Sequence, residues 1–256
     1  MLLAIDVGNS NLTLGLFDEQ ELKRHWRLET SSRRTADEYG LLVTQLLKNS
    51  HYEKDDLDAV IIASVVPTLT PQLEQFVRTT FALRAMVVGP GLKTGMQISY
   101  NPPKDVGADR IVNGVAAYHL CQTACIVVDF GTATTFDSIS ASGEYQGGAI
   151  APGVQISMDA LFQRAAKLPK VDVKKPSHIV GKSTVESMQA GAFFGYVGLV
   201  DGLVTRMKDE MGHKNIHVIA TGGLAANIAA ESKTINTVQE NLTLDGLRLI
   251  YDLNKQ

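Results

Sequence analysis

The chain has little cysteine, little excess charge and no long hydrophobic run. Its 256 residues include only two cysteines, Cys121 and Cys125. Two cysteines in a C-x-x-x-C spacing match no zinc or redox pattern, so we expect reduced, apolar core thiols. Reduced thiols indicate a reducing compartment. A chain of this length can also bury enough surface to fold without disulfides.

The charges exclude some classes of partner. The net charge is −3, from 24 basic and 27 acidic residues, and the basic side chains form pairs such as Arg33-Arg34 and Lys174-Lys175 rather than a stripe. Nucleic acid is therefore not an expected partner. The N-terminal segment MLLAIDVGNSN is apolar for too few positions to form a signal peptide or a membrane span. We expect a cytoplasmic protein without membrane contact.

Three short apolar runs end in polar and glycine residues. Residues 2–5 precede DVGNSN, residues 126–128 precede DFGTATT, and residues 217–220 precede TGG. After the first two turns, residues 12–17 and 135–139 alternate partially, as a second strand does. Each of these two segments is predicted to be a strand, a tight polar turn and a strand. A P-loop or a dinucleotide fingerprint would require a helix after the turn.

Helical patterns separate these hairpins. The expected helices cover residues 35–47, 71–81, 107–120, 183–211 and 244–253. The longest one contains glycines at positions 191, 195, 198 and 202. Small residues at this spacing permit close approach of another helix. They indicate either a subunit interface or tight packing within the chain, and the pattern does not choose between the two.

The chain also contains a weak internal repeat. Two halves, residues 1–118 and 119–256, each have an apolar strand, an Asp and a turn rich in Gly, Thr or Ser near their start. This pattern predicts two related lobes. A cleft between lobes is a common place for a small-molecule site.

The predicted hairpin tips have the groups needed to bind phosphate. Each offers backbone N–H groups, short hydroxyl or amide side chains and one carboxylate, and backbone donors in turns bind anions. The carboxylates of Asp6 and Asp129 cannot bind phosphate themselves, but they could hold a cation such as Mg²⁺, directly or through water. One Asp-Gly turn is a weak signal, whereas two matched turns followed by Thr-Gly-Gly are more specific.

The order of these motifs resembles a known superfamily. DVGNSNLTLGLF, DFGTATTFD and ATGG resemble the phosphate-1, phosphate-2 and adenosine motifs of the actin, hexokinase and sugar-kinase ATPases. Within it the chain resembles the type III pantothenate kinases, or Bvg accessory factors, over nearly its full length. This closer resemblance rests on DVGNSN, YNPP, GADR, DFGTATT, GGAIAPG and ESMQAGAFFG. It implies an α/β fold of two related ribonuclease-H-like lobes, a nucleotide cleft between them, and a homodimer.

The resemblance also implies an activity and a set of site residues. The activity is ATP-dependent phosphorylation of pantothenate to 4′-phosphopantothenate, the first step of coenzyme A synthesis. The implied ATP contacts are Asp6, Val7, Gly8, Asn9, Ser10, Asn11, Leu12, Thr13 and Thr132. The implied pantothenate contacts are Tyr100, Gly107, Ala108, Asp109, Arg110 and Thr184, with Asp109 as the proton acceptor. Asp6 would hold Mg²⁺, and Asp129 would bind K⁺ or NH₄⁺.

Other interpretations of the same residues stay open. Asp109 could be only a first-turn helix cap, and Arg110 only a member of a surface salt bridge. Tyr100 and Thr184 could be ordinary polar packing residues. The protein could instead phosphorylate another small hydroxylated metabolite. It could also be a nucleotide-binding transcriptional accessory factor, although no basic face supports direct DNA binding.

Overall fold

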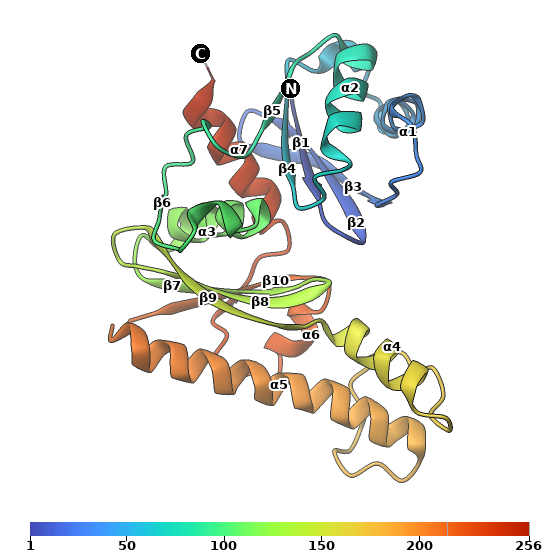
Figure 1. The fold of residues 1–256 in the computed structure, drawn as a ribbon, viewed down its shortest axis with the longest axis vertical. Coiled ribbons are helices and arrows are strands. Elements are labelled where there is room, and N and C mark those ends of the chain that lie inside the picture. Colours follow the sequence, from blue (N-terminus) through green and yellow to red (C-terminus); the bar gives the residue numbers. More distant parts are fainter. Residues whose placement is uncertain (214, 256) are drawn as a thin grey trace. The chain divides into compact units, whose positions relative to one another are not determined.

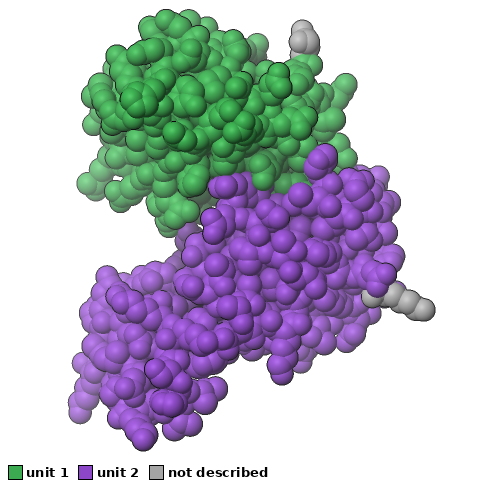
Figure 2. Space-filling model, turned by 180° about the vertical axis from the view of Figure 1, so that it is seen from behind, with its two compact units in different colours: residues 1–96, 101–116, 243–256 green, residues 97–100, 117–242 purple. Residues whose placement is uncertain are grey.

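The computed structural model describes residues 1–213 and 215–255, which form two compact units (Figure 1, Figure 2). Unit 1 comprises residues 1–96, 101–116 and 243–256, and unit 2 comprises residues 97–100 and 117–242. Helix α3, Ala108–Cys121, has residues in both units. Among the described residues, no helix combines the length and apolar character needed to cross a membrane.

Unit 1 is a five-stranded sheet in the order β3-β2-β1-β4-β5. Its strands are β1 (Leu2–Val7), β2 (Asn11–Asp18), β3 (Glu21–Glu29), β4 (Ala59–Ser64) and β5 (Ala85–Val87). Its helical segments are α1 (Ala36–Asn49), η1 (Lys54–Asp56), α2 (Thr70–Phe81), η2 (Pro103–Asp105), the first part of α3, and α7 (Leu242–Asn254). Strands β1, β2 and β3 are antiparallel neighbours, whereas β4 and β5 continue the sheet in parallel.

The alternation along β1 gives the sheet of unit 1 two buried faces. Leu3 and Ile5 pack in the cluster that includes residues of α1 and α2, such as Tyr39 and Phe76. Leu2 and Ala4 point to the other face, in a cluster whose members include Val112 of α3 and Leu244, Leu247 and Ile250 of α7. The unit therefore has three layers, with the sheet in the middle.

Unit 2 is a six-stranded sheet in the order β11-β10-β7-β8-β9-β6. Its strands are β6 (Gln97–Ile98), β7 (Cys125–Phe130), β8 (Ala133–Ile139), β9 (Glu144–Pro152), β10 (His217–Gly222) and β11 (Thr237–Val238). Its helices are α4 (Val154–Arg164), α5 (Thr184–Met211) and α6 (Ala225–Ala229). Figure 1 shows α5 running along one face of the sheet, where Phe193, Val200 and Val204 pack against alternate residues of β7 and β10.

The two sheets have the same topology. Strands β1, β2 and β3 form an antiparallel meander with β4 and β5 parallel to β1. Strands β7, β8 and β9 form the same meander, with β10 and β11 in the places of β4 and β5. Only β6 is additional, at the edge next to β9. The weak repeat in the sequence therefore corresponds to a repeated arrangement of five strands, and the α/β fold class is confirmed.

The predicted strands and helices are present, together with elements that the sequence did not predict, among them β3, β4, β9 and α4. The strand–turn–strand segments are the hairpins β1–β2 and β7–β8, and the predicted helices are α1, α2, α3, α5 and α7. The first helix begins after Thr35, whose side chain accepts a hydrogen bond from the backbone N–H of Glu38. Helix α4 was not predicted. Only Val154 and Met158 are buried on it, so its sequence lacks a strong apolar stripe.

The compact units differ from the predicted division at residue 118. Helix α7 lies near the end of the chain but belongs to unit 1, because Leu244, Leu247 and Ile250 pack against the β1 face described above. Residues 97–100 belong to unit 2, because β6 pairs with β9. Both segments join a unit through contacts with distant residues, which a boundary drawn along the sequence does not capture.

The cysteines only partly match the prediction. Both thiols are free, and Cys125 at the start of β7 is fully buried. Cys121, at the end of α3, is half-buried, so the prediction of a core position is wrong for this residue. The end of α3 is more exposed to solvent than β7, which follows it in the chain.

Candidate active site

The first hairpin of unit 1 has an aspartate at the end of its first strand. Asp6 is half-buried on β1, directly opposite Thr13 of β2. In the turn, the N–H of Gly8 donates to the carbonyl of Asn11 at 3.0 Å. Thr30 holds the turn from outside, because its hydroxyl donates to the carbonyl of Gly8 at 2.7 Å and its N–H donates to that of Ser10 at 3.0 Å. These hydrogen bonds fix the backbone conformation of the turn between β1 and β2.

The second hairpin, in unit 2, repeats this arrangement. Asp129 is half-buried on β7, directly opposite Thr135 of β8, and the N–H of Gly131 donates to the carbonyl of Ala133 at 3.0 Å. The N–H of Gly153, directly after β9, donates to the carbonyl of Thr132 at 3.1 Å. A β-carbon on Gly153 would lie 2.2 Å from that carbonyl oxygen, so only glycine allows this support of the turn.

The third motif, ATGG, lies beside the second hairpin. Strand β10 runs parallel to β7 and pairs Thr221 with Asp129. The next residue, Gly222, has φ of +91°, and a β-carbon there would lie 2.7 Å from Oδ1 of Asp129. Unit 2 thus brings Asp129, Thr132 and the ATGG motif together at one end of its sheet, the carboxyl end of β7 and β10.

Asp6 and Asp129 suit a cation whose other ligands are phosphate oxygens and water. Among the described residues, no group of three or more His, Cys, Asp or Glu side chains is placed to hold a metal ion. Asp6 and Asp129 are each one carboxylate next to a turn of backbone amides and hydroxyls. Mg²⁺ commonly binds in this way, through one or two carboxylates together with substrate phosphates and several waters. These residues therefore suit a metal that arrives with a nucleotide.

Asp109 lies in the first turn of α3, within unit 1. Its Oδ1 accepts a hydrogen bond from the N–H of Arg110 at 2.8 Å. Burial raises the pKa of this carboxyl group, and that hydrogen bond and the positive charge of Arg110 offset the rise only in part. The carboxylate does contact a first-turn N–H, as a cap would. A raised pKa, however, also suits a proton acceptor.

The start of α3 lies close to the end of β1. A β-carbon on Gly107 would lie 2.5 Å from Oδ1 of Asp109 and 3.5 Å from the Val65 side chain. Val65 in turn donates its N–H to the carbonyl of Val7, the last residue of β1, at 3.0 Å. Unit 1 therefore brings the GADR segment toward the strand end that carries Asp6.

The surface salt bridge considered for Arg110 is wrong. Arg110 is only 8% exposed, whereas a surface pair would leave the guanidinium in water. A buried Arg is expected to be paired or hydrogen-bonded to an anion or a carbonyl. Ala108 and Gly107, its neighbours in the motif, are half-buried.

Tyr100 lies in unit 2, at the edge where β6 meets β9. Its side chain is 37% exposed, and its ring contacts the ring of Tyr145 edge-on, with 6.3 Å between centroids and 65° between planes. Gly147, with φ of +119°, lies beside the Tyr100 ring, since a β-carbon there would be 3.6 Å from it, an ordinary contact distance. Tyr100 is therefore held by packing while part of it faces solvent.

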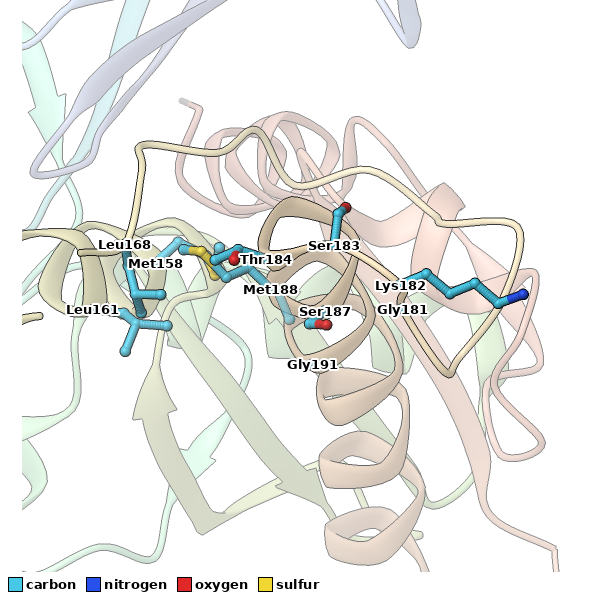
Figure 3. Close-up of a pocket in the computed structure, with 11 residues that line it drawn as sticks. Met158, Leu161, Leu168, Gly181, Lys182, Ser183, Thr184, Ser187, Met188 and Gly191 are labelled. Carbon is cyan, nitrogen blue, oxygen red and sulfur yellow. The ribbon is translucent and has the colours of Figure 1, made fainter.

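Thr184 lines a different part of unit 2. It is the first residue of α5, after Ser183, whose side chain accepts from the N–H of Glu186. It lines a cavity of about 720 Å³ formed by α4, the start of α5 and the segment between them. Figure 3 shows the residues around this cavity. The lining combines apolar side chains with polar ones, namely Met158, Leu161, Leu168, Gly181, Lys182, Ser183, Thr184, Ser187, Met188, Gly191 and Ala192. Neither Tyr100 nor Asp129 is among these described lining residues, so Thr184 is not grouped with the other candidates of its unit.

Three supporting residues were given no role in the sequence analysis. Gly153 and Gly222 belong to recognised motifs, and their roles require close backbone approaches that only the fold reveals. Thr30 had no signal in the sequence, because it follows a strand far along the chain from the turn that it holds.

Comparison with known proteins assigns the family. A family model described as type III pantothenate kinase matches residues 2–206. The type III pantothenate kinases of Citrifermentans bemidjiense and Myxococcus xanthus are 59% and 55% identical to the chain, over 100% and 99% of both sequences. Among solved structures, a Baf family protein from Campylobacter jejuni aligns over 98% of both chains with a TM-score of 0.61 and 19% identity. The ROK hexokinase of Thermus thermophilus aligns over 99% of both with a TM-score of 0.51 and 14% identity, so both structures support the fold. By its sequence, the chain belongs to the type III pantothenate kinase family.

Proposed function

We propose that this protein transfers the γ-phosphoryl group of ATP to pantothenate, giving 4′-phosphopantothenate and ADP at the first step of coenzyme A synthesis. The observation that carries the proposal is the pair of matched hairpins β1–β2 and β7–β8, in a chain whose relatives over its full length are named type III pantothenate kinases. In each hairpin an Asp lies opposite a Thr, next to a turn fixed by backbone hydrogen bonds. Membership of a kinase family implies ATP and a divalent metal ion as cofactors.

The two hairpins would bind the phosphates of ATP. Residues 6–13 of the first and Thr132 of the second offer N–H and hydroxyl donors. Asp6 would hold Mg²⁺, directly or through water. The ion would supply positive charge to the phosphates, while the turns fix the position of the phosphoryl group. Phosphoryl transfer depends mainly on such alignment and charge stabilisation.

Asp109 would accept the proton of the pantothenate hydroxyl. A general base works best when its pKa lies near the working pH, and burial raises the pKa of Asp109 toward that range. Its fixed hydrogen bond with the N–H of Arg110 holds the carboxylate in one orientation. The alcohol needs to lose its proton only late in the reaction, so a carboxylate is basic enough.

Five further residues are proposed as pantothenate contacts. Gly107, Ala108 and Arg110 belong to the GADR segment of unit 1, while Tyr100 and Thr184 belong to unit 2. The planar guanidinium of Arg110 can bind the pantothenate carboxylate or a phosphate through two hydrogen bonds.

Asp129 would bind the monovalent cation, K⁺ or NH₄⁺, of this family. Its carboxylate lies among backbone groups of Gly222 and Phe130, where oxygen atoms can complete the coordination of a weakly hydrated ion. The cation would offset the negative charge of the phosphates nearby.

We also infer a homodimer through α5. A β-carbon at Gly191, Gly195 or Gly198 would meet no atom within 4 Å, so these glycines do not serve packing inside the chain. Large apolar side chains are exposed near the start of α5, in α4 and in the segments beside them, including Ile156, Phe162, Ile179, Val180 and Val185. A second copy of the chain would cover both features. The cytoplasmic location stays a prediction.

The test is ATP-dependent phosphorylation of pantothenate by the purified protein with Mg²⁺, in potassium, ammonium and sodium buffers. Turnover in potassium or ammonium that collapses in sodium would support the substrate and the role of Asp129. Turnover of another hydroxylated metabolite instead would change the substrate assignment. ATP binding without turnover of any acceptor would favour a nucleotide-binding regulator, and the kinase assignment would then be wrong.

A further inference from the structure

Unit 2 contains a buried polar cluster that the proposed reaction does not use. Asp137 of β8 is fully buried, and both of its carboxylate oxygens accept hydrogen bonds. The hydroxyl of Tyr145, on β9, donates to Oδ1 at 2.8 Å, and the hydroxyl of Thr135 donates to Oδ2 at 3.3 Å. A carboxylate without such donors would be costly to bury. The cluster therefore holds the Tyr145 side chain in one orientation.

Tyr145 is the inner member of a pair of aromatic rings. It is fully buried, whereas its partner Tyr100 is 37% exposed. The edge-on contact between the rings, 6.3 Å between centroids, is a favoured geometry for aromatic pairs. The outer ring can therefore take its position from the inner ring.

The backbone around the two rings supports the same arrangement. Residues 97 and 98 of β6 pair with residues 144 and 145 of β9, and the N–H of Ser99 donates to the carbonyl of Tyr145 at 2.8 Å. Tyr100 follows directly after this bond. Gly147 of β9 also lies near the Tyr100 ring, because a β-carbon there would be 3.6 Å from it, an ordinary contact distance.

We propose that Asp137 and Tyr145 are positioning residues, which fix the ring of Tyr100 before pantothenate binds. The inference rests on the proposed function, in which Tyr100 contacts the substrate. A side chain that is already ordered loses less conformational freedom when the substrate arrives, so binding is tighter. The hydroxyl of Tyr145 acts through this order and does not touch the substrate itself.

The test compares the kinetics of Tyr145→Phe with those of the wild type. The variant keeps the inner ring but removes its hydrogen bond to Asp137. The KM for pantothenate should rise by about two- to tenfold, the cost of ordering one side chain at binding, while the KM for ATP should stay within about twofold. Tyr118→Phe is the matched control, because it removes a hydroxyl in the same unit that donates a hydrogen bond to the carbonyl of Ala141. It should leave the KM values for pantothenate and ATP unchanged.

Repeating the substitution in a protein that lacks the Tyr100 ring separates a positioning role from a general structural effect. In the Tyr100→Ala protein, adding Tyr145→Phe should change the KM for pantothenate no further, because the ring to be positioned is gone. An equal effect of Tyr145→Phe in both backgrounds, or an equal rise of both KM values, would overturn the proposal. If Tyr145→Phe does not fold, Asp137→Asn weakens the hydrogen bond that the Tyr145 hydroxyl donates, because a neutral amide oxygen is a poorer acceptor than a carboxylate, and it should also raise the KM for pantothenate. Unchanged constants in that variant would overturn the proposal as well.

The wild-type protein distinguishes this inference from the proposed function. Wild-type turnover of pantothenate together with unchanged constants in Tyr145→Phe would overturn the positioning role alone. Absence of wild-type turnover would overturn the proposed function, and the positioning role with it.

Discussion

The backbone of Gly222 lies against the carboxylate of Asp129. The two residues are on neighbouring parallel strands, and a β-carbon on Gly222 would lie 2.7 Å from Oδ1 of Asp129 and 2.6 Å from the carbonyl oxygen of Phe130. Gly222 also has φ of +91°, a conformation that costs a residue with a side chain about 1–2 kcal/mol. The ATGG motif therefore shapes the proposed cation site as well as the end of its own strand.

Gly222→Ala should both destabilise the protein and weaken its response to potassium. The free energy of unfolding should fall by more than about 1 kcal/mol, because the backbone strain and the two close contacts add. The displaced Asp129 should raise the potassium concentration needed for half-maximal turnover. Chemical denaturation and a potassium titration of the kinase activity measure the two effects.

The neighbouring glycine provides the control for stability. A β-carbon on Gly223 would meet no atom within 4 Å, so Gly223→Ala should unfold at nearly the wild-type denaturant concentration. Equal stabilities for the Gly222→Ala and Gly223→Ala proteins would contradict the argument from close contact.

Asp109→Asn should lose activity yet become more stable at neutral pH. Asparagine keeps an oxygen that can accept the N–H of Arg110 but cannot accept the substrate proton, so turnover should fall by about 10²- to 10⁴-fold. Asp105→Asn, an exposed change on η2 just before α3, should keep wild-type turnover. Near wild-type turnover of Asp109→Asn would remove the base assignment.

The difference in stability between Asp109→Asn and the wild type should depend on pH in a defined direction. Burial raises the pKa of Asp109 in the folded protein above the value of about 3.9 expected in the unfolded chain. The folded state therefore binds this proton more tightly, and the wild type loses stability as the pH rises from about 4 through the raised pKa. The variant has no such loss. Its free energy of unfolding should therefore exceed that of the wild type by an amount that grows between about pH 4 and the raised pKa and stays constant above it. Urea denaturation at several pH values measures it.

The sequence predicted the two hairpins because each combines two local signals. An apolar run followed by Asp and Gly predicts a strand that ends in a turn, and partial alternation in residues 12–17 and 135–139 predicts the returning strand. These signals depend on neighbouring residues only. The same reasoning located α1, α2, α3, α5 and α7, which begin at capping residues or carry apolar stripes.

The features that escaped prediction depend on contacts between distant residues. The burial of Arg110 is decided by what packs over it, which its own sequence context does not contain. The membership of α7 in unit 1 follows from its packing against β1, more than 200 positions earlier in the chain. The contact of Tyr100 with Tyr145 depends on the pairing of β6 with β9, and β6 is too short to give a pattern.

Cys121 should react with alkylating reagents before Cys125. A hydrogen bond with the Cys125 thiol lowers the pKa of Cys121, while the same bond and burial raise that of Cys125. Thiolates are the reactive form, so Cys121 should carry the first label at pH 7–8. Mass spectrometry after limited treatment with iodoacetamide identifies the labelled residue. Cys121→Ser should slow labelling of the folded protein strongly, whereas first labelling at Cys125 would contradict the assigned pKa directions.

Gly195→Leu should separate the proposed dimer without harming the subunit. A β-carbon at this position meets no atom within 4 Å, and leucine favours a helix over glycine by about 0.8–1 kcal/mol, so the folded subunit should be at least as stable. On the surface of a second copy, the larger side chain should prevent the close approach that glycine permits. Light scattering should report a dimer mass for the wild type and a monomer mass for Gly195→Leu. Glu210→Leu adds a similar side chain at an exposed position in the last turn of the same helix, and it should keep the dimer. A dimer that survives Gly195→Leu but dissociates with Glu210→Leu would place the interface elsewhere on α5.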